Sequence, residues 1–198
     1  SGYPGAIWPV NPNRAEILGI PCYVSLADLP GPPDAAFIGV NREASIGAVA
    51  ELAALGAGGA TCFASGFAES EAEGTGGADL QARLVAAAGE MPILGPNCYG
   101  FLNYLDNVTL WPDQHGGVPV TSGVAIVGQS SNVAINMTMQ ARGLPLAYVL
   151  TAGNQAQTSL SDLGMAALSD DRVTALGLHI EGFGDIRAFE ALAAFARG

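Results

Sequence analysis

The chain of 198 residues contains no lysine, and its seven positive charges are all arginine. Together with 18 acidic residues they give a formal net charge of -11. Such a protein does not attract the phosphate backbone of nucleic acids or anionic lipid headgroups overall, so neither a nucleic acid nor a membrane is an expected partner. Without lysine there is also no phosphate-gripping Gly-x-x-x-x-Gly-Lys loop, so the chain does not bind ATP by that route.

Cysteine and long apolar runs are also scarce. Cys22, Cys62 and Cys98 are odd in number, widely spaced and without a Cys-x-x-Cys pair, which argues against a disulfide framework and against a zinc site. We expect buried, reduced thiols. The longest apolar runs, such as residues 144–150, are far too short to span a bilayer. No basic and apolar leader opens the chain, so the expected location is the cytoplasm.

What the sequence does have is a regular alternation of short apolar runs with helical segments. Apolar content of 49% and charged content of 13% fit a folded chain of one large or two small domains. In the first half, strands are expected at residues 35–40, 60–64 and 91–94, with helices at 45–55 and 79–88. Strands that alternate with helices in this way specify right-handed β-α-β units and a parallel sheet. The first part is therefore predicted to be Rossmann-like.

Two short segments precede this alternation. Residues 6–10 read as a strand, and residues 25–29 as one helical turn. The strand has no earlier element to pair with, so we expect either a missing upstream element or an edge position.

A glycine-rich boundary at residues 116–119 separates a second α/β region from the first. Strands are expected at 124–127, 146–150 and 176–180, with one more short strand before the boundary at 108–111. The helices that follow are expected to end near residue 142 and to cover 160–169 and 186–196. The predicted domains are residues 1–117 and residues 118–198. Because three β-α units make only part of a doubly wound domain, we expect the chain to be a segment cut from a longer one at both ends.

Polar residues follow each predicted strand of the first half. They are Asn11-Pro12-Asn13-Arg14, Asn41-Arg42, Ser65-Gly66-Phe67 and Asn97-Cys98. The carboxyl ends of parallel strands meet at one edge, so these groups are expected to line a single crevice that suits a nucleotide-like phosphorylated ligand. The alternative is that they only form turns, because Asn, Pro and Gly do so whether or not anything binds.

Several motifs in order resemble the CoA-binding domain of ADP-forming acyl-CoA synthetases, the acetate-CoA ligase relatives of the succinyl-CoA synthetase α subunit. The matching segments are residues 10–13 (Val-Asn-Pro-Asn), 18–23 (Leu-Gly-Ile-Pro-Cys-Tyr), 25–30 (Ser-Leu-Ala-Asp-Leu-Pro), 65–69 (Ser-Gly-Phe-Ala-Glu) and 95–98 (Gly-Pro-Asn-Cys). The likeness continues through residues 127–131 and 153–154, so it covers nearly the whole chain. It implies an α/β fold: a Rossmann-like CoA-binding domain lacking its first β-α unit, then an incomplete flavodoxin-like domain.

The resemblance implies a reaction in which an acid, CoA and ATP give acyl-CoA, ADP and phosphate through an acyl phosphate and a phosphohistidine. Coenzyme A and a small carboxylic acid would be the partners of the protein, although the segments that would contact the acid are not recognisable in this chain. The positions that match the family's CoA contacts are Val10, Asn11, Pro12, Asn41, Arg42, Ser65, Gly66, Asn97 and Cys98.

In the second domain the resemblance assigns two further elements. The turn Gln129-Ser130-Ser131 precedes a helix whose N-terminus would face the phosphohistidine, where free N–H groups and the helix dipole stabilise a phosphate. Glu181 matches the acidic residue that orients the histidine, because a carboxylate against one ring N–H fixes the tautomer and leaves the other nitrogen free to attack phosphorus.

The sequence departs from the family pattern in three places. The glycine-rich loop that should open the CoA domain is not in the chain, and the usual Ser-Gly of the second-domain turn is Ser130-Ser131. The phosphorylated histidine would lie beyond residue 198, because neither His115 nor His179 has the His-x-Gly setting. ATP or ADP with Mg would bind in an ATP-grasp domain or subunit outside this chain, and the segment alone is expected to be inactive. Exposed strand edges favour homo-oligomers.

Two other functions stay open. The same pair of domains serves as a CoA-sensing module in relatives fused to a lysine acetyltransferase, and the downstream sequence would discriminate. A nicotinamide-dependent enzyme is disfavoured, because there is no Gly-x-Gly-x-x-Gly and Val10 is followed by Asn11 and not by an acidic residue. A covalent role for Cys98 is also disfavoured, since no histidine is placed beside it. The acyl group is not identified by the sequence.

Overall fold

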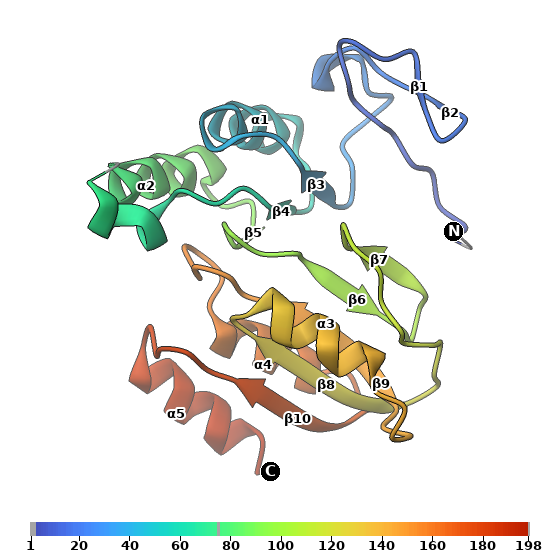
Figure 1. The fold of residues 1–198 in the computed structure, drawn as a ribbon, viewed down its shortest axis with the longest axis vertical. Coiled ribbons are helices and arrows are strands. Elements are labelled where there is room, and N and C mark those ends of the chain that lie inside the picture. The colour runs from blue at the N-terminus through green and yellow to red at the C-terminus, as the bar shows by residue number, and fades with distance from the viewer. Residues whose placement is uncertain (1–2, 75, 198) are drawn as a thin grey trace.

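The computed structural model describes residues 3–74 and 76–197 (Figure 1). It contains two α/β layers, each of which consists of one β-sheet and the helices packed on it. The first sheet is parallel and has the strand order β3 (Ala36–Ile38), β4 (Ala60–Cys62) and β5 (Ile93–Leu94). Helices α1 (Arg42–Leu55) and α2 (Gly77–Ala88) cover the same face of it. Right-handed crossovers between strands taken in chain order produce this arrangement, so the Rossmann-like prediction is confirmed.

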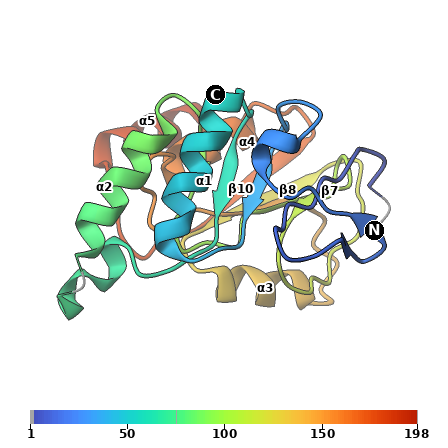
Figure 2. The ribbon, with the colours of Figure 1, turned by 90° about the horizontal axis from the view of Figure 1, so that it is seen from above.

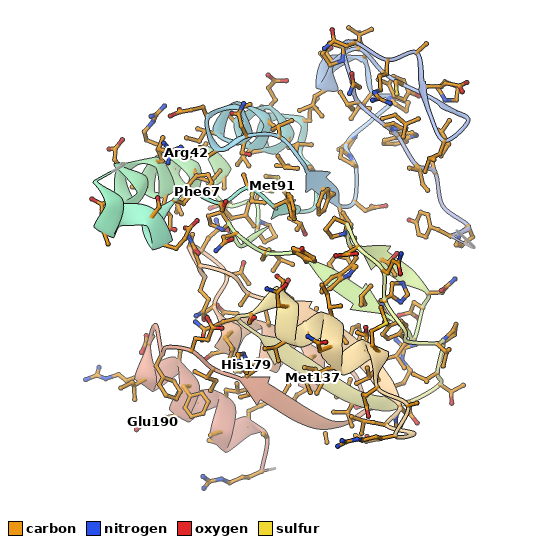
Figure 3. All side chains as sticks on the ribbon, viewed as in Figure 1. Arg42, Phe67, Met91, Met137, His179 and Glu190 are labelled. Carbon is orange, nitrogen blue, oxygen red and sulfur yellow. The ribbon has the colours of Figure 1, made fainter. Side chains whose placement is uncertain are left out.

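The core of the first layer lies between this sheet and its two helices. Val49 and Leu52 of α1 and Leu84 of α2 are at most 2% exposed, and Phe67 and Met91 complete the same cluster (Figure 3). Helix α1 begins three residues before the predicted start, because the Asn41 side chain accepts a hydrogen bond from the Ala44 amide at 2.9 Å and caps the helix. The cap places Arg42 in the first turn of the helix.

The start of the chain differs from the prediction. Residues 6–10 do not form a strand; Val10 makes only an isolated parallel bridge to Tyr23. An unpredicted hairpin, β1 (Glu16–Ile17) with β2 (Ile20–Pro21), turns at Leu18 and Gly19, which both have positive φ. The predicted helical turn is present as η1 (Leu26–Asp28), where the Asp28 carboxylate accepts hydrogen bonds from the Ser25 amide and hydroxyl.

The second sheet is mixed. Its strand order is β10 (Val173–His179), β8 (Gly123–Gly128), β9 (Leu146–Thr151), β6 (Phe101–Asn103) and β7 (Val108–Leu110). The first three strands are parallel, and β6 runs antiparallel to both its neighbours. Figure 2 shows α3 (Ser131–Met139) on one face and α4 (Leu160–Leu168) with α5 (Ile186–Phe195) on the other. This is the flavodoxin-like arrangement that the resemblance implied, although α3 ends before residue 142.

The two sheets divide at an earlier point in the chain than the predicted boundary. Strands β6 and β7 precede residue 118, yet they belong to the second sheet, where β6 pairs with β9 and β7 pairs with β6. The short 3-10 helix η2 (Ala68–Glu73) leads into α2 in the first layer. Division of the chain at residue 118 stays a prediction.

Within the described residues, no helix has the length and apolar character needed to cross a bilayer.

The turn after β5 joins the two layers. Thr151, at the end of β9, is fully buried, and its Oγ1 accepts hydrogen bonds from the amides of Gly100 at 2.8 Å and Tyr99 at 3.1 Å. The same oxygen donates to the Gly100 carbonyl at 2.9 Å. The turn is held from the other side by the Asn97 amide, which donates to the Ala64 carbonyl at 2.9 Å. One turn is therefore bonded to both sheets.

Gly153 fits against this turn too closely for any side chain. A Cβ placed there would lie 2.3 Å from the Pro96 carbonyl oxygen and 2.8 Å from that of Asn97. Its positive φ of 54° also suits glycine. Two backbone amides that follow Gly153 complete the contact: that of Asn154 donates to the Pro96 carbonyl at 2.9 Å, and that of Ala156 donates to the Gly95 carbonyl at 3.0 Å.

Replacing Thr151 by valine tests whether this junction holds the layers together. Valine keeps the shape but leaves the buried Gly100 amide without the hydroxyl that accepts from it, so we expect the free energy of unfolding in urea to fall by roughly 1–3 kcal/mol. Thr109→Val, at the exposed middle position of β7, is the matched control and should change stability by less than about 0.5 kcal/mol. Equal losses in the two variants would contradict the assignment.

Candidate functional site

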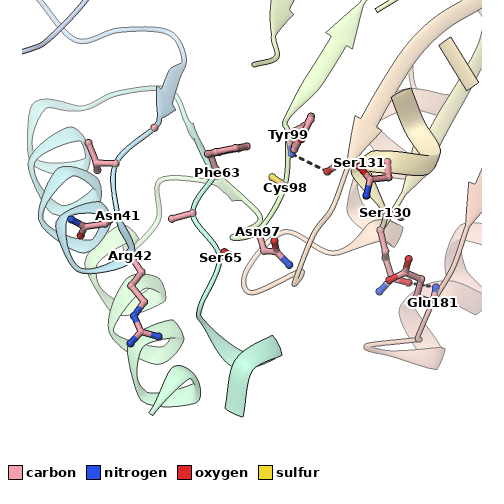
Figure 4. A pocket seen from close by; sticks show the side chains of 15 residues that line it. Asn41, Arg42, Phe63, Ser65, Asn97, Cys98, Tyr99, Ser130, Ser131 and Glu181 are labelled. Carbon is pink, nitrogen blue, oxygen red and sulfur yellow. Dashed lines mark hydrogen bonds between the residues drawn. The ribbon is translucent and has the colours of Figure 1, made fainter. Parts of the chain in front are cut away.

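A cavity of about 730 Å³ opens where the carboxyl edge of the first sheet meets the start of α3 (Figure 4). Its wall is built from five chain segments brought together by the fold. The residues that line it are Gly39, Val40, Asn41, Arg42, Phe63, Ala64, Ser65, Asn97, Cys98, Tyr99, Gln129, Ser130, Ser131, Asn132 and Glu181. The cavity therefore lies between the layers and takes residues from both.

The wall formed by the first sheet carries Arg42, the one arginine among the residues that line the cavity. The Arg42 guanidinium donates from Nη1 to the Gly66 carbonyl at 2.6 Å, which fixes the side chain across the end of β4. The Gly66 amide in turn donates to Glu69 at 2.5 Å. Ser65, which directly precedes Gly66, is exposed and lines the cavity. Arg42 thus sits in the first turn of α1, where the helix dipole also favours an anion.

Glu69 links this wall to the second layer. Its carboxylate accepts hydrogen bonds from the Gly66 amide and from the Asn154 side chain, which also donates to Gln81 at 3.0 Å. Burial raises the pKa of Glu69, but these hydrogen bonds lower it by more, so the net pKa lies below its usual value. The carboxylate is therefore ionised at neutral pH and holds the loop after β9 against the loop after β4.

The centre of the cavity is formed by the turn after β5. Asn97 has a φ of 58° and an exposed side chain, whereas Cys98 is only 1% exposed. Burial raises the pKa of the Cys98 thiol to about 12, and burial together with the neighbouring Cys98 raises that of Cys62 to about 12. Both thiols are protonated at neutral pH, and a protonated thiol is a poor nucleophile.

The opposite wall is the start of α3. The Ser130 hydroxyl caps the helix by accepting from the Val133 amide at 3.4 Å, and the Ser131 hydroxyl accepts from the Tyr99 amide at 3.1 Å. The first amides of an α-helix have no partner inside the helix, so this end presents N–H groups to the cavity. Figure 4 shows Ser130 and Ser131 beside Glu181.

Gln129 shapes the same wall through its side chain. Its Oε1 accepts hydrogen bonds from the amides of Glu181 and Gly182, the second at 2.9 Å. The backbone amide of Gln129 donates to the His179 carbonyl at 3.1 Å. The side-chain oxygen of Gln129 thus holds the turn that carries Glu181.

The structure brings most of the sequence-predicted site residues together at the cavity, with four exceptions. Those that line the cavity are Asn41, Arg42, Ser65, Asn97, Cys98, Gln129, Ser130, Ser131 and Glu181. Gly66 does not line the cavity, but its carbonyl accepts a hydrogen bond from Arg42 and its amide donates one to Glu69. Val10, Asn11 and Pro12 are not among the lining residues; Val10 pairs with Tyr23, and the Asn11 side chain accepts from the Asn13 amide at 2.9 Å.

Sequence reasoning missed the apolar part of the wall. Val40, Phe63 and Tyr99 line the cavity, and Val40 and Phe63 are 47% and 39% exposed. Each directly adjoins a polar residue already predicted for the strand ends or lies within two positions of one, which was the available signal. Apolar residues beside a strand end are more often core, so their exposure became visible only in the structure.

The two histidines lie in different surroundings. The Nδ1 atom of His115 shares a hydrogen bond with the Tyr104 hydroxyl at 3.1 Å, and this bond fixes the segment before β8. His179 ends β10 beside the cavity wall, and its Nδ1 is buried without a hydrogen-bond partner in the described part of the chain. All three cysteines are free thiols. No group of three or more metal-ligating side chains occurs in residues 3–74 and 76–197.

Comparison with known proteins gives two family matches. Residues 3–104 match the CoA binding domain, and residues 121–197 match the succinyl-CoA ligase like flavodoxin domain. The chain is 32% identical to trans-feruloyl-CoA synthase FCS1 of an unknown prokaryotic organism, over 96% of this chain and 28% of that protein. It is 30% identical to the ADP-forming acetate-CoA ligase II of Archaeoglobus fulgidus, over 99% of this chain and 29% of that protein. The chain thus spans less than a third of either relative.

A solved structure has the same fold. The dinucleotide-forming acetyl-coenzyme A synthetase 1 of Ca. Korarchaeum cryptofilum, in complex with phosphate and ADP, superimposes with a TM-score of 0.83 at 27% identity. The match covers 98% of this chain and 41% of that one.

Thiol labelling tests the environment of the two buried cysteines. We expect iodoacetamide near neutral pH, about pH 7, to modify Cys22 in the folded protein and to leave Cys62 and Cys98 unmodified, because their raised pKa values keep them protonated and their burial blocks access. Peptide mass spectrometry locates the label, and labelling in urea serves as the positive control. Rapid modification of Cys98 in the folded protein would show a reactive thiol instead.

Proposed function

Because the chain belongs to the family of ADP-forming acyl-CoA synthetases, with a CoA-binding domain followed by a succinyl-CoA ligase-like domain, we propose that its cavity binds coenzyme A during acyl-CoA synthesis. The overall reaction would convert an acid, CoA and ATP into acyl-CoA, ADP and phosphate. The observation that carries this proposal is a single cavity formed by the strand ends of the first sheet and the start of α3.

The residues of the cavity fit the chemistry of coenzyme A. Its phosphates are anions, which suit Arg42 and the first turn of α1. Its pantetheine arm combines apolar methylene groups with amides, which suit the exposed Phe63 and the polar side chains of Ser65 and Asn97. When bound, coenzyme A supplies the thiol that accepts the acyl group.

The start of α3 would stabilise a phosphoryl group carried by a histidine outside this chain. The free amides of its first turn and the Ser131 hydroxyl provide donors, and the helix dipole adds a favourable field. Glu181, held in place by Gln129, would orient the histidine ring. ATP or ADP with Mg would bind in an ATP-grasp domain or subunit, and the phosphate and ADP in the similar solved structure support that part of the proposal.

The acyl group is a separate question. The two relatives described above are named for feruloyl-CoA and for acetate, one with an aromatic group and one small and aliphatic. Family membership therefore supports a carboxylic acid as substrate and leaves its class open.

Arg42→Gln tests the CoA site. Loss of a charged donor facing a phosphate should weaken CoA binding to the whole protein roughly tenfold to a hundredfold, as measured by isothermal titration calorimetry. The matched control is Arg83→Gln on α2. The Arg83 side chain is 54% exposed, and its Nη1 forms a long ion pair of 3.9 Å with Oε2 of Glu43, so this variant should bind CoA like the unsubstituted protein. A whole protein that does not bind CoA would refute the proposal.

Glu181→Gln tests the second wall. The neutral amide cannot stabilise the positive charge that develops on a histidine ring as a carboxylate does. The whole protein should therefore gain acid-labile phosphate from ATP roughly ten to a hundred times more slowly, while its affinity for CoA is unchanged. Glu190→Gln on the exposed side of α5 is the matched control and should behave like the unsubstituted protein. A protein that binds CoA but gains no such phosphate and makes no acyl-CoA would instead be a CoA-sensing module.

A further inference from the structure

Gly66 is held at both its carbonyl and its amide by side chains. The carbonyl accepts a hydrogen bond from Nη1 of Arg42 at 2.6 Å, and the amide donates one to Oε1 of Glu69 at 2.5 Å. The φ of Gly66 is 93°, which favours glycine, and a Cβ there would lie 3.0 Å from both Cδ and Nη1 of Arg42. The Arg42 side chain therefore packs directly on Gly66, so its place at the cavity wall (Figure 4) depends on where Gly66 lies.

Glu69 keeps Gly66 in place from outside the cavity. It lies in η2 and is not one of the described residues that line the cavity. One of its carboxylate oxygens accepts from the Gly66 amide, and the other accepts from the Asn154 side chain. Because both partners are donors, the position needs two acceptor oxygens on one side chain, which a carboxylate supplies. A glutamine at residue 69 would have the same length, but one of its two ends is itself a donor.

Asn154 ties this arrangement to the second layer. Its side-chain nitrogen donates one hydrogen to Glu69 and the other to Oε1 of Gln81 at 3.0 Å, so both hydrogens of the amide group are used. Its backbone amide donates to the Pro96 carbonyl at 2.9 Å, in the turn that forms the centre of the cavity. An unbroken series of hydrogen bonds therefore runs from that turn to Arg42.

Arg42 is held in this way without being neutralised. The ion pairs found among the described residues belong to Arg83 and Arg172, and none of them includes Arg42. The partner of Arg42 is an uncharged peptide carbonyl, so the guanidinium keeps its charge for an anion in the cavity. A carboxylate in direct contact would also fix the side chain, but it would compete with that anion. Glu69 acts through the peptide backbone instead, and the charge of Arg42 stays available.

We propose that Glu69 is a positioning residue for coenzyme A, because through Gly66 it holds the Arg42 guanidinium at the cavity wall. Asn154 of the second layer completes the arrangement by holding Glu69. This rests on the proposed function, which assigns the phosphates of coenzyme A to Arg42. The affinity for an anion in the cavity then depends on a hydrogen bond between the two layers, the one that joins Asn154 to Glu69.

Glu69→Gln in the whole protein tests this role. Loss of a negative charge near an anion would by itself strengthen binding, whereas loss of one of the two acceptors should free Gly66 and with it Arg42. We expect the Kd for CoA, measured by isothermal titration calorimetry, to rise roughly threefold to tenfold. Unchanged or tighter CoA binding would overturn the proposal.

The matched control is Glu71→Gln in the same 3-10 helix. It removes the same charge from a carboxylate that accepts a hydrogen bond from the Ala78 amide at 2.8 Å. A glutamine oxygen can still accept this single bond, so the variant should not weaken CoA binding.

An exchange of the two side chains across the layers tests the hydrogen bonds themselves. In the double variant Glu69→Gln with Asn154→Asp, the glutamine oxygen can accept from the Gly66 amide and the glutamine nitrogen can donate to the aspartate. Gln81 can rotate its amide group to donate to the same aspartate. The pairing and the net charge are both restored, so the Kd for CoA should return to within about twofold of the value for the unsubstituted protein. Asn154→Asp alone places two carboxylates together and should weaken CoA binding at least as much as Glu69→Gln.

Two measurements distinguish positioning from a general loosening of the structure. With Arg42→Gln already present, Glu69→Gln should change the Kd for CoA by less than about twofold, because residues that act through one contact are not additive. A full further loss on that background would contradict the proposal. The gain of acid-labile phosphate from ATP, which we assign to the wall at the start of α3, should keep its rate in Glu69→Gln. A slower gain would show a loosened junction between the layers and would overturn the assignment.

Labelling of arginine without any ligand separates this proposal from the proposed function. Phenylglyoxal should modify Arg42 of the whole protein at least roughly threefold faster in Glu69→Gln than in Glu71→Gln, as located by peptide mass spectrometry, because the guanidinium loses its fixed partner. If CoA does not bind but Arg42 is released in this way, the proposed function fails and the positioning role of Glu69 stands. If CoA binds and Glu69→Gln changes neither its affinity nor the labelling, the positioning role is refuted and the proposed function stands.

Discussion

The hydrogen bonds of Thr151 with the backbone of Tyr99 and Gly100 are the constraint on which the site depends. They join the end of β9 to the turn that follows β5, and Gly153 packs against the same turn without room for a Cβ atom. The turn in turn holds Asn97, Cys98 and Tyr99 at the centre of the cavity. Because buried polar groups are costly when unpaired, this junction tolerates little change in the position of one layer relative to the other.

The cavity shows how an acidic protein can suit an anionic ligand. The net charge of -11 repels anions at long range, but such a field is screened over about 10 Å at ordinary ionic strength. Within the cavity the field is set by Arg42 and by the first turns of α1 and α3. Glu181 is the acidic residue among those that line it, and Gln129 holds the turn of Glu181 beside the start of α3. Local donors therefore decide what the site attracts.

A row of aromatic rings that contact one another in turn depends on the same junction; its members are Phe37, Phe63, Tyr99 and Trp111. Phe37 and Phe63 belong to the first layer, whereas Trp111 follows a strand of the second sheet, and Tyr99 lies in the turn between them. A shift between the layers would separate Tyr99 from its neighbours and open the wall beside Ser131. Packing between aromatic rings and hydrogen bonding at Thr151 thus fix one surface together.

The sequence by itself determined the α/β class, the order of most helices and strands, and the gathering of Asn41, Ser65 and Asn97 at one edge. Apolar periodicity is a local property, and strands that alternate with helices form parallel sheets whose carboxyl ends share one edge. It did not determine the start of the chain, where Val10 pairs with Tyr23 and lies outside the lining of the cavity. Nor did it reveal that β6 and β7 join the second sheet or that Phe63 faces the cavity. Only the tertiary structure decided these, since strand partners and the exposure of an apolar ring depend on contacts between residues far apart in the chain.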